Sequence, residues 1–82
     1  MAVLTVSLPE LTDIAEFVNI MGKFPYEAQL TVGSYSVDAK SIMGIFTLDR
    51  EQPMLLETET NDSTAVSALA KALNKFTAMP VN

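Results

Sequence analysis

The stretch DAKSIMGIFTL, residues 38–48, changes character at Ser41. The residues before the serine are typical of the end of a β-strand, and those after it form an apolar run interrupted by Gly44. Serine is preferred at the start of a helix because its hydroxyl accepts a hydrogen bond from an unpaired backbone N–H. The stretch therefore predicts a short helix that begins at Ser41. Its apolar residues are Ile42, Met43, Ile45, Phe46 and Leu48.

A β-hairpin is predicted immediately before this helix. Apolar and polar residues alternate in residues 27–32 and again in residues 35–39, as in strands with one buried face. The apolar positions are Ala28, Leu30, Val32, Tyr35, Val37 and Ala39. Between the two segments, Gly33-Ser34 fits a two-residue turn, which needs a positive φ angle at its first position. The two segments are therefore expected to pair as antiparallel strands.

Two longer segments have the apolar spacing of amphipathic helices. In residues 9–24 the apolar stripe consists of Ile14, Phe17, Val18, Met21 and Phe24. In residues 61–76 it consists of Val66, Leu69, Ala70, Leu73 and Phe76. Both stripes are wide enough to cover one face of a sheet.

The ends of these helices also carry sequence signals. Ser7 or Thr12 is expected to cap the first helix, and Ser7 with Glu10 has the spacing of a capping box. Pro25 is expected to end that helix, because proline cannot continue the hydrogen-bond pattern. The second helix has two candidate caps, Asp62 and Ser63.

Two further strands complete the predicted fold. In residues 3–8, Leu4, Val6 and Leu8 share one face, whereas residues 54–60 alternate less clearly. The element order is then β-α-β-β-α-β-α within a single domain spanning residues 1–82. This order predicts an α+β architecture, in which helices cover one face of an antiparallel sheet and the other face is largely polar.

The composition excludes several kinds of site. The chain has 82 residues, no cysteine, no histidine and a formal net charge of −5. Disulfides, thiolate metal sites and phosphohistidine are therefore impossible within it. The basic residues are few and scattered, which argues against direct binding of nucleic acid. We expect no cofactor and no metal, and we expect the chain not to be an enzyme.

The distribution of apolar residues indicates where in the cell the protein is expected. No apolar run approaches the 18 residues or so that a membrane-spanning helix needs. The first residues contain neither a basic segment nor a long apolar core, so they do not resemble a signal peptide. The sequence thus favours a cytoplasmic protein without a membrane partner.

The segment AKSIMGIFTL, residues 39–48, closely resembles the regulatory-serine segment of HPr, the small phosphocarrier of the bacterial phosphotransferase system. The resemblance extends over about residues 3–76. The helix that includes AEFVNIMGKF, the hairpin, the short helix and the final helix NDSTAVSALAKAL follow in the same order with similar spacing. The resemblance implies an open-faced β-sandwich, with a four-stranded antiparallel sheet in the order 1-4-2-3 and three helices on one face.

The chain departs from the family at the active-site histidine. HPr carries its phosphoryl group on a histidine in a Gly-x-His-Ala-Arg-Pro motif, whereas the corresponding region here reads SLPELTDIAEF. Counting back from Ser41 without gaps places Glu10 at the histidine and Thr12 at the neighbouring arginine; a loop shorter by one or two residues is the alternative. A phosphohistidine cannot form, although Glu10 or Asp13 could in principle form an acyl phosphate.

Ser41 is then the main candidate site. In the family this serine is phosphorylated by HPr kinase, and the product is a corepressor for catabolite control protein A, a LacI-type repressor. A relative without the histidine, the catabolite-repression HPr, is the kind of variant that this sequence resembles. Capping alone does not explain the residues around Ser41. We therefore predict a regulatory or adaptor protein that acts through Ser41 and through the partner-binding residues Lys40, Ile42, Met43 and Phe46.

Two alternatives remain open. In the first, the chain is a structural or interaction domain and Ser41 is only a helix cap. In the second, it is a carrier that uses Glu10 or Asp13 as the phosphoacceptor. Glu10, Asp13 and Glu16 are also explained as acidic residues that favour the N-terminus of a helix.

Overall fold

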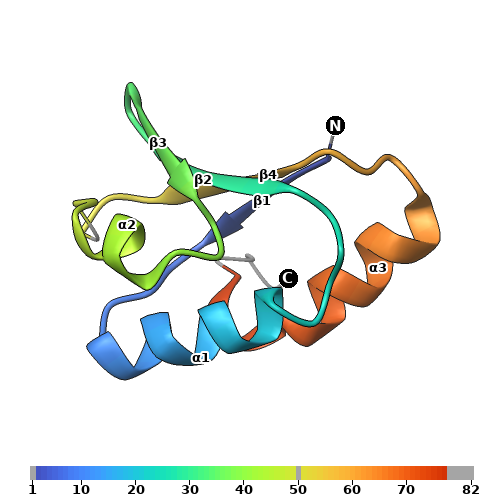
Figure 1. Ribbon diagram of the computed structural model, residues 1–82, viewed down its shortest axis with the longest axis horizontal. Helices are drawn as coiled ribbons and strands as arrows, with labels where there is room; N and C mark the ends of the chain where they lie inside the picture. The colour runs from blue at the N-terminus through green and yellow to red at the C-terminus, as the bar shows by residue number, and fades with distance from the viewer. Residues whose placement is uncertain (1, 50, 78–82) are drawn as a thin grey trace, which may run out of the picture.

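A computed structural model describes residues 2–49 and 51–77 (Figure 1). The predicted order of strands and helices is confirmed, and a short 3-10 helix follows the last α-helix. The elements are β1 (Ala2–Val6), α1 (Leu11–Met21), β2 (Ala28–Val32), β3 (Tyr35–Asp38), α2 (Ile42–Phe46), β4 (Met54–Thr58), α3 (Ser63–Ala72) and η1 (Asn74–Phe76).

The four strands form one antiparallel sheet in the order β1-β4-β2-β3. This is the order that the resemblance to HPr implied. β4 lies between β1 and β2, so strands that are distant in sequence are hydrogen-bonded neighbours. In Figure 1, α1 and α3 lie below the sheet and α2 lies beside them, under the β2–β3 hairpin. The helices thus share one side of the sheet, as expected for this α+β fold.

The two central strands alternate between buried and exposed side chains. In β4, Met54, Leu56 and Thr58 are buried, while Leu55 lies on the outer face and is exposed. The sequence obscured this alternation because Leu55 is apolar and Thr58 is polar. Thr58 is only 2% exposed, and its hydroxyl donates a hydrogen bond to the Thr60 carbonyl at 3.3 Å. That bond lets a polar residue occupy a core position.

The hairpin has the predicted two-residue turn. Gly33 has a φ angle of +61°, and Val32 pairs with Tyr35 across the turn. Tyr35, however, is 74% exposed and does not join the core. The short helix α2 does not cover the end of the sheet at the hairpin. Tyr35 therefore stays exposed, although the alternating pattern of β3 places it on the same face as buried residues.

The apolar stripes of the two long helices meet in one core. Ile14, Phe17 and Met21 of α1 are buried in the same cluster as Leu69 of α3. The rings of Phe17 and Phe76 contact each other edge to face, with centroids 6.2 Å apart. The predicted stripe of α3 is only partly right. Val66 and Ala70 are partly buried, whereas Ala65, which lay outside the predicted stripe, is buried. Ala65 and Leu69 are four residues apart and so share the buried face of the helix.

The cap predicted for the first helix is wrong. Glu10 is the N-cap of α1, and its backbone N–H donates to the Asp13 carboxylate at 3.0 Å. Ser7 instead donates its backbone N–H to the Phe76 carbonyl at 2.7 Å, which holds it beside η1. The cap of α3 is confirmed, since the Asp62 carboxylate accepts a hydrogen bond from the Thr64 N–H.

We expect Leu69→Ala to destabilise the protein by about 2–5 kcal/mol, because it leaves a cavity where a fully buried side chain was. The free energy of unfolding, measured by urea denaturation and circular dichroism, tests this. Lys71→Ala on the exposed side of α3 is the control, and it should change stability by less than about 0.5 kcal/mol. Equal stabilities of the two variants would contradict the core packing described here.

Candidate functional site

Ser41 caps α2, as its sequence context predicted. Its Oγ accepts a hydrogen bond from the Gly44 backbone N–H at 3.1 Å, and its side chain is half-buried. The backbone of Ser41 is extended and turns into the helix at Ile42. The hydroxyl therefore lies at the junction between the strand-end loop and the helix.

Gly44 is explained by close packing of α2 on the sheet. A Cβ atom at this position would lie 3.2 Å from the Val37 Cβ and 3.3 Å from the Ser41 Oγ. Both distances are tighter than ordinary van der Waals contact, so a side chain there would require its neighbours to move by a few tenths of an ångström. Folding alone thus accounts for the glycine in this segment.

Lys40 also has a structural partner. Its Nζ donates a hydrogen bond to the Phe24 carbonyl at 2.7 Å, and the side chain is half-buried. Phe24 follows the C-terminal end of α1, so the lysine ties that end to the start of α2. The backbone N–H of Lys40 donates to the Asp38 carboxylate at 2.9 Å, and this bond fixes the turn before Ser41. A role of Lys40 in partner binding stays a prediction, and such a role would compete with the bond to Phe24.

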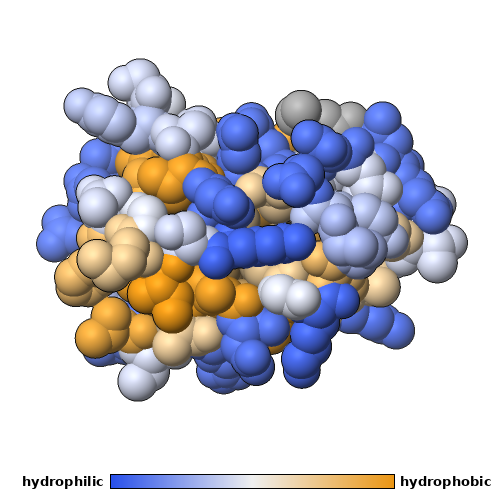
Figure 2. All heavy atoms as spheres, in the orientation of Figure 1, coloured by the Kyte–Doolittle hydropathy of each residue, from blue (hydrophilic) through white to orange (hydrophobic). Residues whose placement is uncertain are grey.

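Exposed apolar side chains surround this junction. Met43 is 75% exposed, and Ile42 and Phe46 are about half exposed. Leu11, in the first turn of α1, is 57% exposed. In Figure 2, apolar surface gathers over α2 and the first turn of α1, and the two helices contact each other. We call Leu11, Ile42, Met43 and Phe46 the α2 patch.

Leu11 was not among the residues singled out from the sequence. It lies three residues before Ile14, on the helical spacing of the buried stripe, so its sequence position gave no sign of exposure. Only the place where α1 begins, beyond the edge of the core, leaves it accessible.

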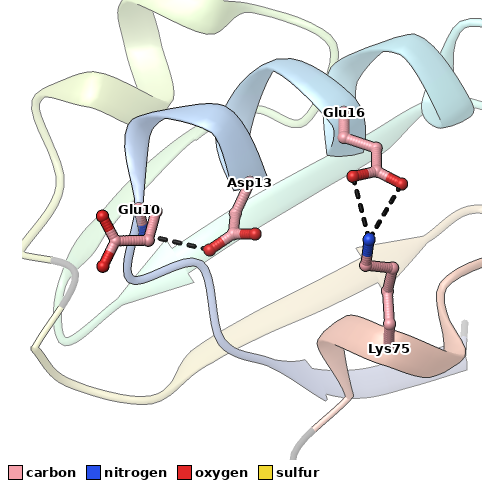
Figure 3. A network of polar contacts seen from close by, with 4 residues as sticks. All are labelled: Glu10, Asp13, Glu16 and Lys75. Carbon is pink, nitrogen blue, oxygen red and sulfur yellow. Dashed lines mark hydrogen bonds and ion pairs between the residues drawn. The ribbon is translucent and has the colours of Figure 1, made fainter.

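The acidic residues of α1 do not converge on one point. Figure 3 shows the Glu10 carboxylate pointing away from Asp13, whose own carboxylate is bonded to the backbone. Glu16 forms an ion pair with Lys75 at 3.0 Å. Within residues 2–49 and 51–77, no group of three acidic, histidine or cysteine side chains could hold a metal ion. These contacts agree with a helix-capping role for Asp13 and a surface ion pair for Glu16.

The helices of the protein are short. Among the described parts of the chain, no helix has the length and apolar character needed to cross a bilayer.

A comparison with protein-family models identifies the family. The model described as "PTS HPr component phosphorylation site" matches residues 12–78. The chain belongs to the HPr family. The matched region includes Ser41 and begins after Glu10. The placement of Glu10 at the histidine position of HPr stays a prediction.

Solved HPr structures resemble the chain over most of its length. HPr-C-His from Thermoanaerobacter tengcongensis matches with a TM-score of 0.72 and 28% identity, over 92% of this chain and 93% of its own. The phosphocarrier protein HPr from Bacillus anthracis strain Ames has a TM-score of 0.64 and 28% identity, over 89% and 99%.

A third structural relative is Crh, the catabolite repression containing protein of Bacillus subtilis, whose structure is described as a domain-swapped dimer. It matches with a TM-score of 0.63 and 25% identity, over 85% of this chain and 84% of its own. No curated protein matches the chain.

We expect Lys40→Met to destabilise the protein by about 1.5 kcal/mol, the low end for loss of a hydrogen bond from a charged donor, because the bond is only partly buried. Urea denaturation measures the change. The matched control is Lys23→Met, which changes an exposed lysine just past the C-terminal end of α1. It should cost less than about 0.5 kcal/mol. Equal costs would mean that the bond to Phe24 contributes nothing.

Proposed function

We propose that this HPr-family protein is a regulatory or adaptor protein of carbon catabolite control, and that it acts through phosphorylation of Ser41 and through the α2 patch. The observation that carries the proposal is the position of Ser41 beside exposed Ile42 and Met43 in a chain without histidine. Packing explains Lys40 and Gly44, whereas Ile42 and Met43 expose apolar surface that the fold itself does not need.

The local chemistry suits a switch. A phosphoryl group adds about −1.5 to −2 charges at neutral pH. Added to Ser41, this charge would stand at the edge of the α2 patch, so a partner could recognise an apolar surface and an anion together. The change requires little rearrangement, because the serine already lies at the start of α2. Contact surfaces of this kind, apolar with a charged rim, are common at protein interfaces.

The partners we propose are HPr kinase, which would modify Ser41, and a LacI-type repressor such as catabolite control protein A. The support is the likeness to Crh, named for catabolite repression, and the family match that includes Ser41. Neither partner would need a phosphohistidine on this chain. Binding would therefore depend on surface contacts and on the phosphoserine.

One observation favours a second function. The hydrogen bond from the Gly44 N–H to the Ser41 Oγ shows that the serine has a structural role of its own. A purely structural or interaction domain would keep Ser41 for this bond and use the α2 patch for an unrelated protein. The two functions differ in whether a kinase acts on the serine.

We expect HPr kinase to phosphorylate Ser41 and Ser41→Ala to abolish the modification, as measured by intact mass and peptide sequencing. Ser41→Ala should cost about 0.5–2 kcal/mol of stability, the range for loss of a helix cap. Ser63→Ala, at the start of α3, is the control and should still be modified.

Phosphorylation should strengthen binding to the repressor, and Met43→Asp should weaken that binding without unfolding the protein.

The kinase used must be active on a typical HPr in the same assay. If such a kinase leaves Ser41 unmodified, the serine is only a helix cap, and the second function above is the better one. Unchanged repressor binding by the Met43→Asp variant would separate the α2 patch from the interface.

We expect the protein to remain unmodified when it is incubated with phosphoenolpyruvate and the general phosphotransferase enzyme, because no histidine is present. Intact mass spectrometry tests this, with a typical HPr as the positive control. A hydroxylamine-sensitive phosphoryl group that disappears in Glu10→Gln or Asp13→Asn would instead establish a carboxylate carrier.

A further inference from the structure

A groove of about 530 Å³ lies between the β2–β3 hairpin and the loop that follows α2. Its apolar lining includes Val32, Val37 and Leu48. Its polar lining includes the Asp49 and Gln52 side chains of the loop. In Figure 2, apolar surface is visible below the tip of the hairpin. The groove is not part of the Ser41 junction, and its volume is in the range of small-ligand sites.

An exposed aromatic ring borders the groove. Tyr35 pairs with Val32 at the end of the hairpin and is 74% exposed. Because the ring is accessible and borders an apolar groove, it offers a stacking surface. The face of such a ring carries partial negative charge and attracts cations, guanidinium groups most often.

Asp49 supplies a fixed negative charge at the same groove. Its carboxylate accepts hydrogen bonds from the Gln52 Nε2 at 2.9 Å and from the Glu51 backbone N–H at 3.1 Å. These bonds, that from Gln52 first, hold the pKa of Asp49 below its ordinary value. The carboxylate is thus ionised and oriented at neutral pH. A carboxylate has about four acceptor positions, and these two bonds use one on each oxygen, so the group has the capacity to accept further N–H groups.

From these features we infer that the groove binds an arginine side chain of a polypeptide partner. The apolar lining matches the methylene stem, the ring of Tyr35 matches the planar face of the guanidinium, and Asp49 matches its N–H groups. The formal net charge of −5 also favours a basic partner over an acidic one. A lysine would fit less well, because its ammonium is compact, strongly hydrated and cannot stack.

The choice of a polypeptide rests on the proposed docking role of the α2 patch. Thr47 lines the groove directly after α2, and Met43 lies one helical turn before it. Residues four apart on a helix share a face, so the α2 patch and the groove are neighbouring parts of one surface. A polypeptide that covers the patch can therefore place a side chain in the groove. The choice of arginine depends on the groove alone and does not require phosphorylation.

The test uses a capped heptapeptide with one central arginine between leucine and glycine residues, and a twin with citrulline, which has nearly the same shape without the charge. The whole protein, carrying Ser41→Ala so that phosphorylation plays no part, is titrated with each peptide and followed by amide NMR shifts. The arginine peptide should bind at least about fivefold more tightly, the size of an exposed cation–π and charge contact. The shifts should centre on Tyr35, Thr47 and Leu48.

Variants locate the effect. Asp49→Asn should abolish the preference for arginine, and Tyr35→Leu should reduce it. Glu59→Gln, which removes one exposed charge from another part of the protein, should preserve it. Arg50→Gln, which removes the arginine next to Asp49 in sequence, should preserve or increase it; position 50 lies outside the described residues. Amide spectra of the unbound variants check that each is folded.

Equal binding of the two peptides would overturn the inference, as would a preference that survives Asp49→Asn or shifts centred away from the groove. Loss of the preference in Arg50→Gln or in Glu59→Gln would also overturn it. Because Ser41 is absent from every protein in this titration, these outcomes are independent of whether a kinase modifies the serine.

Discussion

The insertion of β4 between β1 and β2 is the constraint on which the rest of the structure depends. Thr58 of β4 pairs with Ala2 on one side and with Ala28 on the other, so three segments that are each more than 20 residues apart in the chain meet along one strand. The helices then have a single continuous face to cover. Because β3 is an edge strand and β4 is internal, the chain between them must pass β2, and α2 lies in that connection.

The position of α2 determines what the protein can present to a partner. A short helix in a connection buries only part of its surface, here Ile45, while the rest faces outward. Two features hold α2 in place. The lack of a side chain at Gly44 allows the helix to pack closely on β3, and the hydrogen bond from Lys40 to the Phe24 carbonyl ties the start of α2 to the end of α1. The exposed side chains of Ile42 and Met43 are thus carried on a well-anchored helix, which reduces the ordering cost of any contact they make.

The start of α1 is held by a local contact that needs no histidine. Where HPr has a histidine for phosphoryl transfer, this chain has a helix N-terminus that its own Asp13 satisfies. The capping bond needs only neighbouring residues, so the helix remains stable without the histidine motif. The Ser41 segment lies on a different element and does not depend on that replacement. A change at the start of α1 therefore leaves the Ser41 segment intact, as expected when function resides in sites and not in the fold as a whole.

Local patterns in the sequence determined the elements themselves. The spacing of Ile14 and Phe17, the turn at Gly33 and the caps at Ser41 and Asp62 each involve residues close in the chain, whose preferences act before any tertiary contact forms. The hairpin pairing of β2 with β3 was also predicted from the local pattern. The rest of the strand order came from the resemblance to HPr, because periodicity cannot say which strands distant in sequence pair.

Only the tertiary structure decided which residues face solvent and which distant residues meet. It placed Leu11 at the surface and Ala65 in the core, joined Lys40 to Phe24, and brought Tyr35 and Asp49 to one groove. Each of these outcomes depends on where a helix or strand ends relative to a neighbour that is distant in sequence. Hydropathy records how apolar a side chain is, whereas its burial depends on whether another element covers it.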